Sequence, residues 1–285
     1  MALEISTRGV RRQGGRSALG TALASGCESN RTAGQSMIST MGASTGLRIG
    51  TAGWGLPRLW RGEFPADGSY LERYAARFDA VEINSSFYRQ HRRGVYERWA
   101  AAVPLEFRFA VKVPRAITHD QSLVAADVLL EVFLEEVAGL GSRLGPLLIQ
   151  LPPSLALNEE HAEEFFETLR RLHAGPVALE PRHESWFGAK ADQMMRRHRV
   201  TRVAADPARV PAAAEPGGDP GLVYYRLHGS PRIYWSDYEP ARIAALAERL
   251  RRAATAGVDR WCIFDNTTLG AATGNALALA SLLSD

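Results

Sequence analysis

Residues 80–86 read AVEINSS, a short apolar run that ends in polar residues and precedes a stretch with helical spacing. Alternation along this run places Glu82 and Asn84 on one face, while Val81 and Ile83 point toward the helices. A short apolar run followed by a helix is typical of a strand in a parallel sheet. The stretch therefore predicts a β-strand that presents polar side chains at its carboxyl end.

The same order of strand and then helix recurs along the chain from Leu47 onward. Eight runs rich in Val, Ile, Leu and Phe are predicted strands: Arg48–Gly53, Ala80–Ser86, Phe107–Val113, Pro146–Leu151, Pro176–Glu180, Thr201–Asp206, Leu222–His228 and Arg260–Asp265. The helices predicted between them are Ser69–Phe78, Gly94–Ala102, Ser122–Leu140, Glu159–His173, Ala189–His198, Pro240–Ala256 and Gly270–Leu283. The connection Pro207–Gly221 contains four prolines and is predicted to lack a regular helix.

Eight strands that alternate with helices match a single (β/α)8 TIM-type barrel in both count and length. The sequence thus predicts an α/β fold with one barrel domain over residues 47–285. An open, doubly wound sheet is the alternative. The first strand is not followed by the Gly-x-Gly-x-x-Gly turn that marks a dinucleotide site in such sheets, and we expect no cofactor.

The first 46 residues differ in composition from the rest of the chain. They contain eight Gly, seven Ser and no Phe, Trp, Tyr or Pro. Such a segment cannot bury enough apolar surface to order itself. We expect residues 1–46 to be a disordered tail or to precede the true start, with Met37 or Met41 as that start.

Charge and cysteine content limit the classes of function. The formal net charge of +3 comes entirely from residues 1–46, and the remaining chain carries 29 basic and 29 acidic residues. A neutral body argues against a nucleic-acid partner, which would need a net basic face. Apolar runs are all shorter than the ~20 residues of a membrane helix, so a soluble protein is expected. Cys27 and Cys262 are expected to be free thiols in a cytoplasmic, reducing environment.

Polar residues occur at the carboxyl end of nearly every predicted strand, which is the catalytic face of a parallel barrel. They are Glu82 and Asn84, Lys112, Gln150, Glu180 with Arg182 and His183, Asp206, Arg226 and His228, and Asp265 with Asn266. Burying so many ionisable groups costs several kcal/mol for each unpaired ion. They are therefore predicted to line a polar pocket or to pair around a ligand. Trp54 and Trp186 follow strands at the same end and could form a stacking surface, or could pack long loops.

Several of these strings resemble the YecE-like family, catalogued as domain of unknown function seventy-two. The resemblance runs over residues 47–283 and is carried by GTAGW at 50–54, VEINSSFY at 81–88, QLPP at 150–153, EPRHESW at 180–186, RLHG at 226–229 and FDNT at 264–267. It implies a TIM-barrel fold and supplies no reaction. The chain departs from the common family pattern at Pro181 and at Asp265, where many members have Asn, so Asp265 adds a carboxylate to the expected site.

The first functional hypothesis is an enzyme without a metal that acts on a small anionic or polyhydroxylated molecule. Glu82 and Glu180 would be the general acid and base, and His183 or His228 could move protons. Three cations of the protein would neutralise a carboxylate or phosphate on the substrate. They are Lys112, Arg182 and Arg226. The remaining expected substrate contacts are Asn84, Gln150, Asp206, Asp265, Asn266, Trp54 and Trp186.

Two alternatives remain open at this point. A metal-dependent phosphodiesterase or isomerase could use Glu82, Glu180, His183, Asp206, His228 and Asp265 as ligands, with His119 from a loop. Three cations share the expected pocket and would repel a metal, so the enzyme without a metal is favoured. The second alternative is a binding module without catalytic activity.

Overall fold

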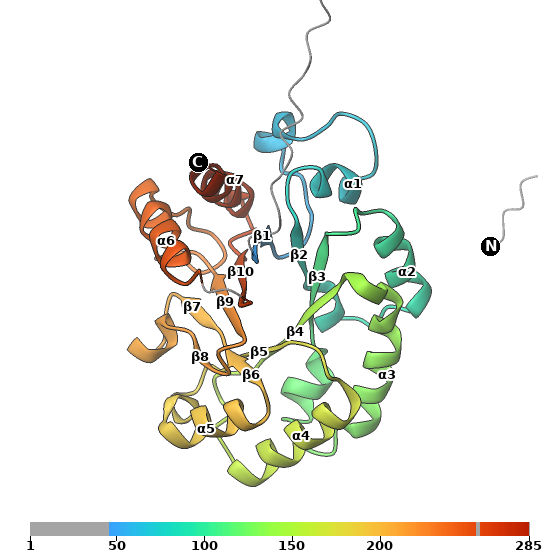
Figure 1. The fold of residues 1–285 in the computed structure, drawn as a ribbon, viewed down its shortest axis with the longest axis vertical. Coiled ribbons are helices and arrows are strands. Elements are labelled where there is room, and N and C mark those ends of the chain that lie inside the picture. The colour runs from blue at the N-terminus through green and yellow to red at the C-terminus, as the bar shows by residue number, and fades with distance from the viewer. Residues whose placement is uncertain (1–45, 255–256, 285) are drawn as a thin grey trace, which may run out of the picture. The chain divides into compact units, whose positions relative to one another are not determined.

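The computed structural model describes residues 46–254 and 257–284. The expectations for residues 1–46, apart from Gly46, fall outside these described residues. Within them the fold alternates strands and helices, and Figure 1 shows the strands at the centre with the helices around them.

The strands are short and almost wholly buried. They are β1 Leu47–Thr51, β2 Ala80–Ile83, β3 Arg108–Lys112, β4 Leu144–Gln150, β5 Val177–Glu180, β6 Val200–Arg202, β7 Ala204–Asp206, β8 Gly217–Gly218, β9 Leu222–Leu227 and β10 Asp259–Phe264. The helices are α1 Tyr70–Ala75, α2 Arg93–Ala101, α3 Asp127–Val137, α4 Glu159–Leu172, α5 Ala189–Arg197, α6 Pro240–Arg252 and α7 Ala271–Ser284. Short helical turns lie between them: η1 Arg58–Glu63, η2 Ser85–Phe87, η3 Ala116–Asp120, η4 Ala138–Arg143, η5 Glu184–Phe187 and η6 Pro211–Ala214.

The strands form two sheets. One has the order β1-β10-β9-β7 and the other β2-β3-β4-β5-β6-β8. Every pairing is parallel except that of β8 with β6. The coarse prediction of an α/β fold with parallel strands is therefore confirmed.

The two sheets approach each other at two places. An isolated parallel bridge joins Ala52, just after β1, to Glu82 in β2, and the Gly53 amide donates to the Glu82 carbonyl at 2.9 Å. At the other place the chain runs from β6 through Val203 into β7, so that β6 pairs with β5 while β7 pairs with β9. The predicted strand Thr201–Asp206 is thus divided between the sheets.

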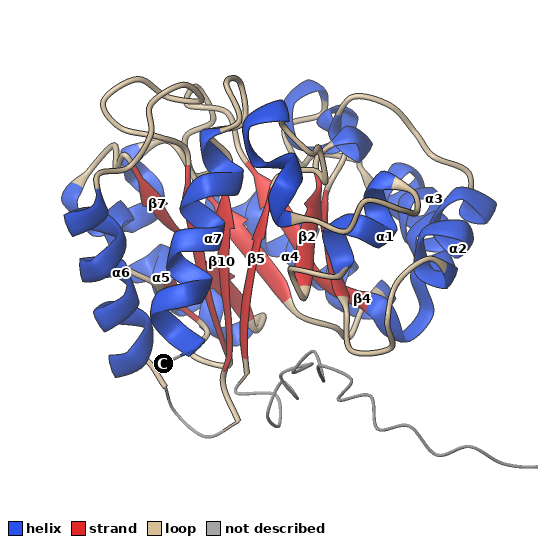
Figure 2. Cartoon of the chain, turned by 90° about the horizontal axis from the view of Figure 1, so that it is seen from above, coloured by secondary structure: helices blue, strands red, loops and turns tan. Residues whose placement is uncertain are grey.

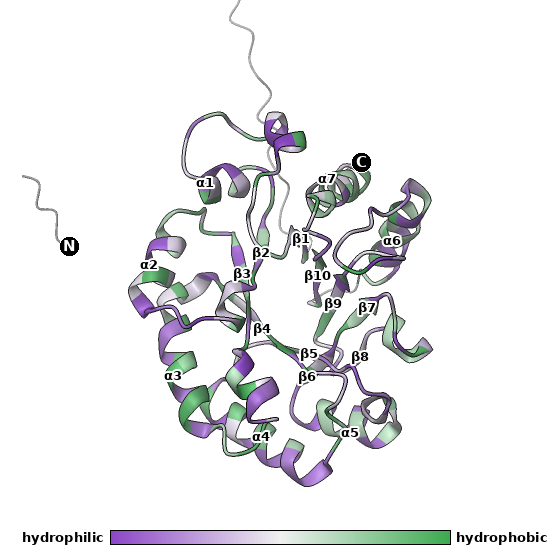
Figure 3. Cartoon of the chain, turned by 180° about the vertical axis from the view of Figure 1, so that it is seen from behind, coloured by the Kyte–Doolittle hydropathy of each residue, from purple (hydrophilic) through white to green (hydrophobic). Residues whose placement is uncertain are grey.

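Most of the apolar core lies between the strands and the surrounding helices. α4 shows how the helices contribute, because its buried residues include Phe165, Phe166 and Leu169 while its other positions are largely charged. Figure 3 shows this mixture of hydrophobic and hydrophilic residues along the helix. Asn158 begins α4 by accepting from the His161 amide at 3.1 Å.

A second, smaller apolar cluster takes residues from strands of both sheets. Its members are Ala80, Ala110, Leu148, Ala178, Val203, Leu222, Tyr224, Trp261 and Ile263. The rings of Tyr224 and Trp261 are stacked with centroids 6.0 Å apart. Trp261 also lies against Gly145, where an added Cβ would come within 2.7 Å of the indole ring. This cluster lies next to the polar groups described below, since Tyr224 is two residues before Arg226.

Helix α3 begins later than predicted, whereas the proline-rich connection Pro207–Gly221 agrees with its prediction. Helix α3 begins at Asp127, five residues after the predicted start, because Ser122, Leu123 and Ala125 have positive φ values of 52°, 71° and 48°. Such values are incompatible with a right-handed helix. The connection Pro207–Gly221 contains only η6 and the two-residue β8, as its prolines predict.

A cavity of about 340 Å³ lies between β7, β9 and α6, lined by residues that include Tyr225, Leu227 and Ile243. Figure 2 shows α6 and α7 packed along the strands on this side.

Throughout the described residues, every helix is too short or too polar to cross a bilayer.

Candidate functional site

One arginine lies among three carboxylates at the carboxyl ends of the strands. Arg226, in β9, is fully buried. Its Nε and Nη2 donate to both oxygens of Glu82 at 2.7–3.3 Å, and its Nη1 donates to Glu180 Oε2 at 3.0 Å. Asp265 Oδ2 lies 2.9 Å from Nη2. All of the guanidinium nitrogens are therefore engaged by carboxylates from β2, β5 and the end of β10.

His228 lies between two of the same carboxylates. Its Nε2 is 2.9 Å from Glu180 Oε1, and its Nδ1 is 3.1 Å from Asp265 Oδ2. Burial alone would lower the pKa of His228, but the charge of Glu180 and the hydrogen bonds to both carboxylates raise it above the ordinary value. The raised pKa favours the imidazolium form, in which each ring nitrogen can direct an N–H at one carboxylate.

Glu180 has four side-chain partners in the cluster. Besides Arg226 and His228, Gln150 Nε2 donates to its Oε1 at 3.0 Å, and Arg182 donates to the same oxygen at 3.1–3.2 Å. Burial would raise the pKa of Glu180, but the positive charges of His228 and Arg226 lower it well below the ordinary value. Glu180 is therefore ionised, and its neighbours are all donors.

Lys112 ends β3 and differs from the other cations in the cluster. Its ammonium lies 4.0 Å from the centroid of the Phe87 ring, and the residue is only 4% exposed. Burial and the charge of Arg226 lower the pKa of Lys112 to about 8, although Glu82, Glu180 and Asp265 oppose the shift. This amine is therefore partly neutral in mildly alkaline solution.

A cavity opens beside one wall of the cluster. It has a volume of about 260 Å³ and is lined by Glu180, Arg182 and His228, with Arg209 as a further cation. The rest of its lining is short and apolar: Pro181, Ala205, Pro207, Ala208, Ala213 and Ile233. Glu82 and Arg226 do not line this cavity. The cluster therefore has an accessible side, formed by Glu180, Arg182 and His228, and a buried side.

The donor set does not suit a metal ion. The guanidinium of Arg226 occupies the space between Glu82, Glu180 and Asp265 that a cation would need. Over residues 46–254 and 257–284, no group of three His, Cys, Asp or Glu side chains is arranged to hold an ion. The carboxylates are therefore neutralised by side chains of the protein itself.

Four of the residues predicted for the site lie away from the cluster. His183 caps η5, where its Nδ1 lies 2.9 Å from Ser185 Oγ. Asp206 pairs with Arg242 and accepts from Tyr238 at 2.9 Å. The two tryptophans pack against the apolar core: Trp54 is half-buried and lies edge-on to the Trp99 ring at 5.0 Å, and Trp186 is buried and donates to the Leu155 carbonyl.

Two asparagines predicted for the site keep an unpartnered oxygen. Asn266 is fully buried, and its amide nitrogen donates to Ser236 and Asn275 while its Oδ1 accepts no hydrogen bond in the described residues. Asn84 Oδ1, at the end of β2, is buried in the same way. Each oxygen can accept one further hydrogen bond.

Sequence reasoning missed two residues of this region. Tyr224 donates to Glu82 Oε2 at 3.0 Å from two positions before Arg226. The alternation that placed Arg226 and His228 on one face of the strand could have added Tyr224. Arg209 lies in the proline-rich connection, where no periodicity indicates the direction of a side chain.

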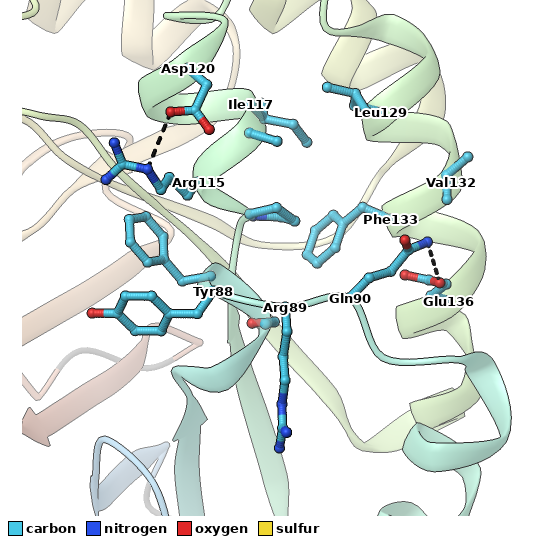
Figure 4. A pocket seen from close by; sticks show the side chains of 14 residues that line it. Tyr88, Arg89, Gln90, Arg115, Ile117, Asp120, Leu129, Val132, Phe133 and Glu136 are labelled. Carbon is cyan, nitrogen blue, oxygen red and sulfur yellow. Dashed lines mark hydrogen bonds and ion pairs between the residues drawn. The ribbon is translucent and has the colours of Figure 1, made fainter.

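A separate cavity of about 290 Å³ lies beside η2, η3 and α3. Figure 4 shows apolar side chains such as Ile117 and Phe133 on its walls, and most of the charged groups at its edge have a partner among the lining residues. Arg115 contacts Asp120 at 3.2 Å, and Gln90 donates to Glu136 at 2.7 Å. This cavity lacks the converging charges of the strand-end cluster, although Phe87 lines it as well.

Parallel strands with helices around them, and an ionic cluster at the strand ends, define an α/β protein. The chain belongs to the family described as protein of unknown function DUF72, whose model matches residues 48–285. This confirms the family resemblance found in the sequence.

Two curated relatives match part of the chain. UPF0759 protein YecE of Escherichia coli K12 is 31% identical over 175 residues, which is 59% of this chain and 61% of that protein. UPF0759 protein YunF of Bacillus subtilis 168 is 28% identical over 147 residues, 50% of this chain and 52% of that protein. The chain thus spans between half and two thirds of the length of these relatives.

Two solved structures share the fold. A DUF72 family protein of Enterococcus faecalis V583 aligns with a TM-score of 0.71 at 24% identity, covering 84% of this chain and 96% of that one. A DUF72 family protein of Thermotoga maritima MSB8 aligns with a TM-score of 0.69 at 25% identity, covering 84% and 99%. These similarities support the fold and carry no reaction.

Proposed function

We propose that this protein is an enzyme that binds a small anionic molecule in the 260 Å³ cavity and acts on it by general acid and base chemistry. The observation that carries the proposal is the wall of that cavity, where Arg182 and Arg209 lie beside the His228–Glu180 pair. Two cations can neutralise a carboxylate or phosphate, and the pair can exchange a proton with the bound molecule.

His228 is the group proposed to move the proton. Glu180 and Asp265 hold its ring in one orientation and stabilise the imidazolium, as a carboxylate does for a catalytic histidine. Gln150 and Arg182 in turn fix Glu180. Glu82 and Arg226 are proposed to position these groups from the buried side, rather than to contact the substrate.

We also propose that the two sheets together form one (β/α)8 barrel. The parallel bridge from Ala52 to Glu82 and the continuous passage from β6 to β7 support closure at both junctions. A further support is the small apolar cluster, which takes alternate residues from strands of both sheets and would fill the interior. The ionic cluster would then be the next layer toward the catalytic face.

Thermal denaturation in the presence of phosphate, sulfate, acetate and their neutral analogues tests the proposal. An anion that binds the folded state alone raises the melting temperature by mass action. The shift should shrink in Arg209→Gln, which removes an exposed cation of the cavity. Arg77→Gln is the matched control, because Arg77 is also exposed and lies outside the cavity.

Two results would overturn the proposal. One is an anion-induced shift that is equal in the parent, Arg209→Gln and Arg77→Gln. The other is stoichiometric zinc or manganese in the purified protein, with stability lost when a chelator removes it. The second result would favour the metal-dependent alternative.

A further inference from the structure

An apolar surface lies on the outer side of helix α3. Val128 is 71% exposed, and Leu129 and Val132 are each 39% exposed. Val128 and Val132 are four residues apart, so they lie on one side of the helix and form a ridge along it. The opposite side of α3 packs into the core through Leu130 and Phe133. Large apolar side chains that gather on a surface, rather than lie singly, are typical of a binding site.

The 290 Å³ cavity beside η2, η3 and α3 forms a groove next to this ridge. Leu129 and Val132 line it on the α3 side, and Tyr88, which is 75% exposed, lines it at the end of η2. Figure 4 shows Ile117 and Phe133 between them. The volume is at the lower limit of small-molecule pockets, which span ~300–1,000 Å³. The groove therefore suits one large apolar side chain that enters from outside the protein.

The exposed part of α3 next to the ridge is acidic. Glu131 and Glu135 follow Val128 and Val132 by three residues, so the helical spacing places them beside these valines. Both glutamates are exposed, and within the described residues neither has a hydrogen bond or an ion pair. The helix has four acidic residues and no basic one. Its surface therefore combines an apolar ridge with uncompensated negative charge.

Helix α4 packs against α3 and extends the acidic surface (Figure 1). Glu160, Glu164 and Glu167 of α4 are exposed and have no polar partner among the residues that the structure describes. Glu163 differs, because it pairs with Arg197 of α5 at 3.0 Å. The unpaired glutamates of the two helices produce a negative potential that attracts a cationic partner.

The cations near the groove do not cancel this potential. Arg115 and Asp120 pair with each other at 3.2 Å on the η3 side of the groove. Figure 4 shows Arg89 directed away from Ile117 and Phe133. Neither arginine forms an ion pair with a glutamate of α3 or α4 in the described part of the chain. The acidic side chains therefore remain free to bind an external cation.

This charge decides among the possible occupants of the groove. A second copy of the chain across a twofold axis would bring two such acidic faces together, and like charges across an interface are unfavourable. The anionic surface of a membrane would be repelled for the same reason. A basic segment of another protein is attracted by the glutamates and can bury an apolar side chain in the groove.

We propose that this α3 surface binds a basic amphipathic helix of a partner protein. The α3 surface comprises the ridge of Val128 and Val132, the 290 Å³ groove, and Glu131 with Glu135. One large apolar side chain of the bound helix enters the groove, and its neighbours one turn away contact the ridge, because a helix presents apolar residues every three or four positions. Lys or Arg residues on its flank pair with the glutamates. The inference goes beyond the proposed function, since this groove and the 260 Å³ cavity share no lining residue.

Fluorescence anisotropy with a labelled synthetic helix tests the inference. The probe is a helix of about 14 residues with Leu at i, i+3, i+4 and i+7 and with Lys at the other positions. Its matched control has Glu in place of every Lys. We expect the Lys helix to bind the full chain at least about tenfold more tightly than the Glu helix does, and the difference to decrease as salt is added.

Two variants separate the apolar and ionic contributions. Val132→Ser places a neutral polar group on the ridge and should weaken binding of the Lys helix by at least about threefold. Its control is Leu59→Ser, because Leu59 is 78% exposed and lies on η1. The double variant of Glu131→Gln and Glu135→Gln should weaken binding about three- to tenfold in low salt, as the loss of two exposed ion pairs predicts.

The matched control for the double variant is Glu63→Gln combined with Glu106→Gln. Both of these residues are exposed and lie outside α3 and α4, so the change in net charge is the same. The inference is overturned if the Lys and Glu helices bind equally tightly, or if Val132→Ser and the double variant at Glu131 and Glu135 bind the Lys helix as tightly as their controls do.

Two further measurements address the other occupants. Sedimentation that shows a dimer of the chain, which Val132→Ser dissociates, would assign the surface to a second copy and overturn the inference. Binding to vesicles of phosphatidylcholine and phosphatidylserine, lost in Val132→Ser, would assign it to a membrane and overturn it as well. A monomer that ignores these vesicles and prefers the Lys helix supports the inference.

Discussion

Replacing Glu82 with glutamine removes one charge from the ionic cluster while preserving the shape of the side chain. In the native protein Glu82 is fully buried, and its two oxygens accept from Arg226 and from the hydroxyl of Tyr224. The variant Glu82→Gln keeps one acceptor oxygen but offers an NH2 group to a guanidinium that has no lone pair to receive it. The change therefore breaks one ion pair and leaves a poor contact behind.

The size of the expected loss of stability follows from the burial of both Glu82 and Arg226. Removing one partner of a buried ion pair costs about 3–5 kcal/mol, and here Arg226 loses one of its three carboxylates and keeps Glu180 and Asp265. In a domain of this size each kcal/mol lowers the melting temperature by roughly 2–4 °C. We therefore expect Glu82→Gln to lower it by about 6–20 °C.

The assay is urea denaturation followed by tryptophan fluorescence, with Trp261 as a buried reporter. Tyr224→Phe provides an intermediate step, because it removes only one hydrogen bond to Glu82 and should cost about 1–3 kcal/mol. Glu106→Gln, at an exposed position, is the control and should change little. If Glu82→Gln loses no more stability than the control, the buried pair does not stabilise the fold. Glu82 would then return to consideration as a group that acts on substrate.

Three further predictions concern other parts of the molecule. The urea midpoint should respond to this cluster at both ends of the pH range: the raised pKa of His228 gives stability that is lost as pH rises above about 6.5, and the lowered pKa of Glu180 gives stability that is lost as pH falls below about 4.5. His228→Asn should remove the alkaline decline, and a decline that persists would contradict this account. Gly274→Ala should destabilise the protein by about 1–3 kcal/mol in a thermal melt, despite the higher helix propensity of alanine, because the added Cβ collides with the Trp60 ring. Deletion of residues 1–46 should leave the melting temperature of the remaining chain unchanged, and a drop of several degrees would show that they pack on it.

The strand-end positions of the cluster could be predicted because local alternation determines them. Glu82, Glu180 and Arg226 each follow a short apolar run, and parallel strands bring their carboxyl ends to one side. The structure places Arg226 within hydrogen-bond distance of both Glu82 and Glu180, as the convergence of the strands requires. For these residues, the spacing within one strand was sufficient to predict their place at the strand ends.

The partners of these residues could not be predicted, because they depend on the register of strands that are distant in sequence. In the prediction from the sequence, Glu82 and Glu180 were equivalent candidates for the general acid and base. Only the packed structure shows that Glu180 lines a cavity and Glu82 does not. Likewise His183 follows a strand as His228 does, but a turn of helix η5 directs it to Ser185. Loop residues lack the alternation that fixes side chains within a strand.

The contact between Glu82 and Arg226 spans 144 residues of chain, and this separation affects the order of folding. During synthesis, β2 leaves the ribosome long before β9, so Glu82 has no arginine partner until most of the chain has emerged. An early compact intermediate that buried Glu82 would enclose an uncompensated carboxylate. The ionic cluster therefore opposes complete closure of a partly synthesised chain. It makes the final packing at the strand ends a late, cooperative step that requires both halves of the molecule.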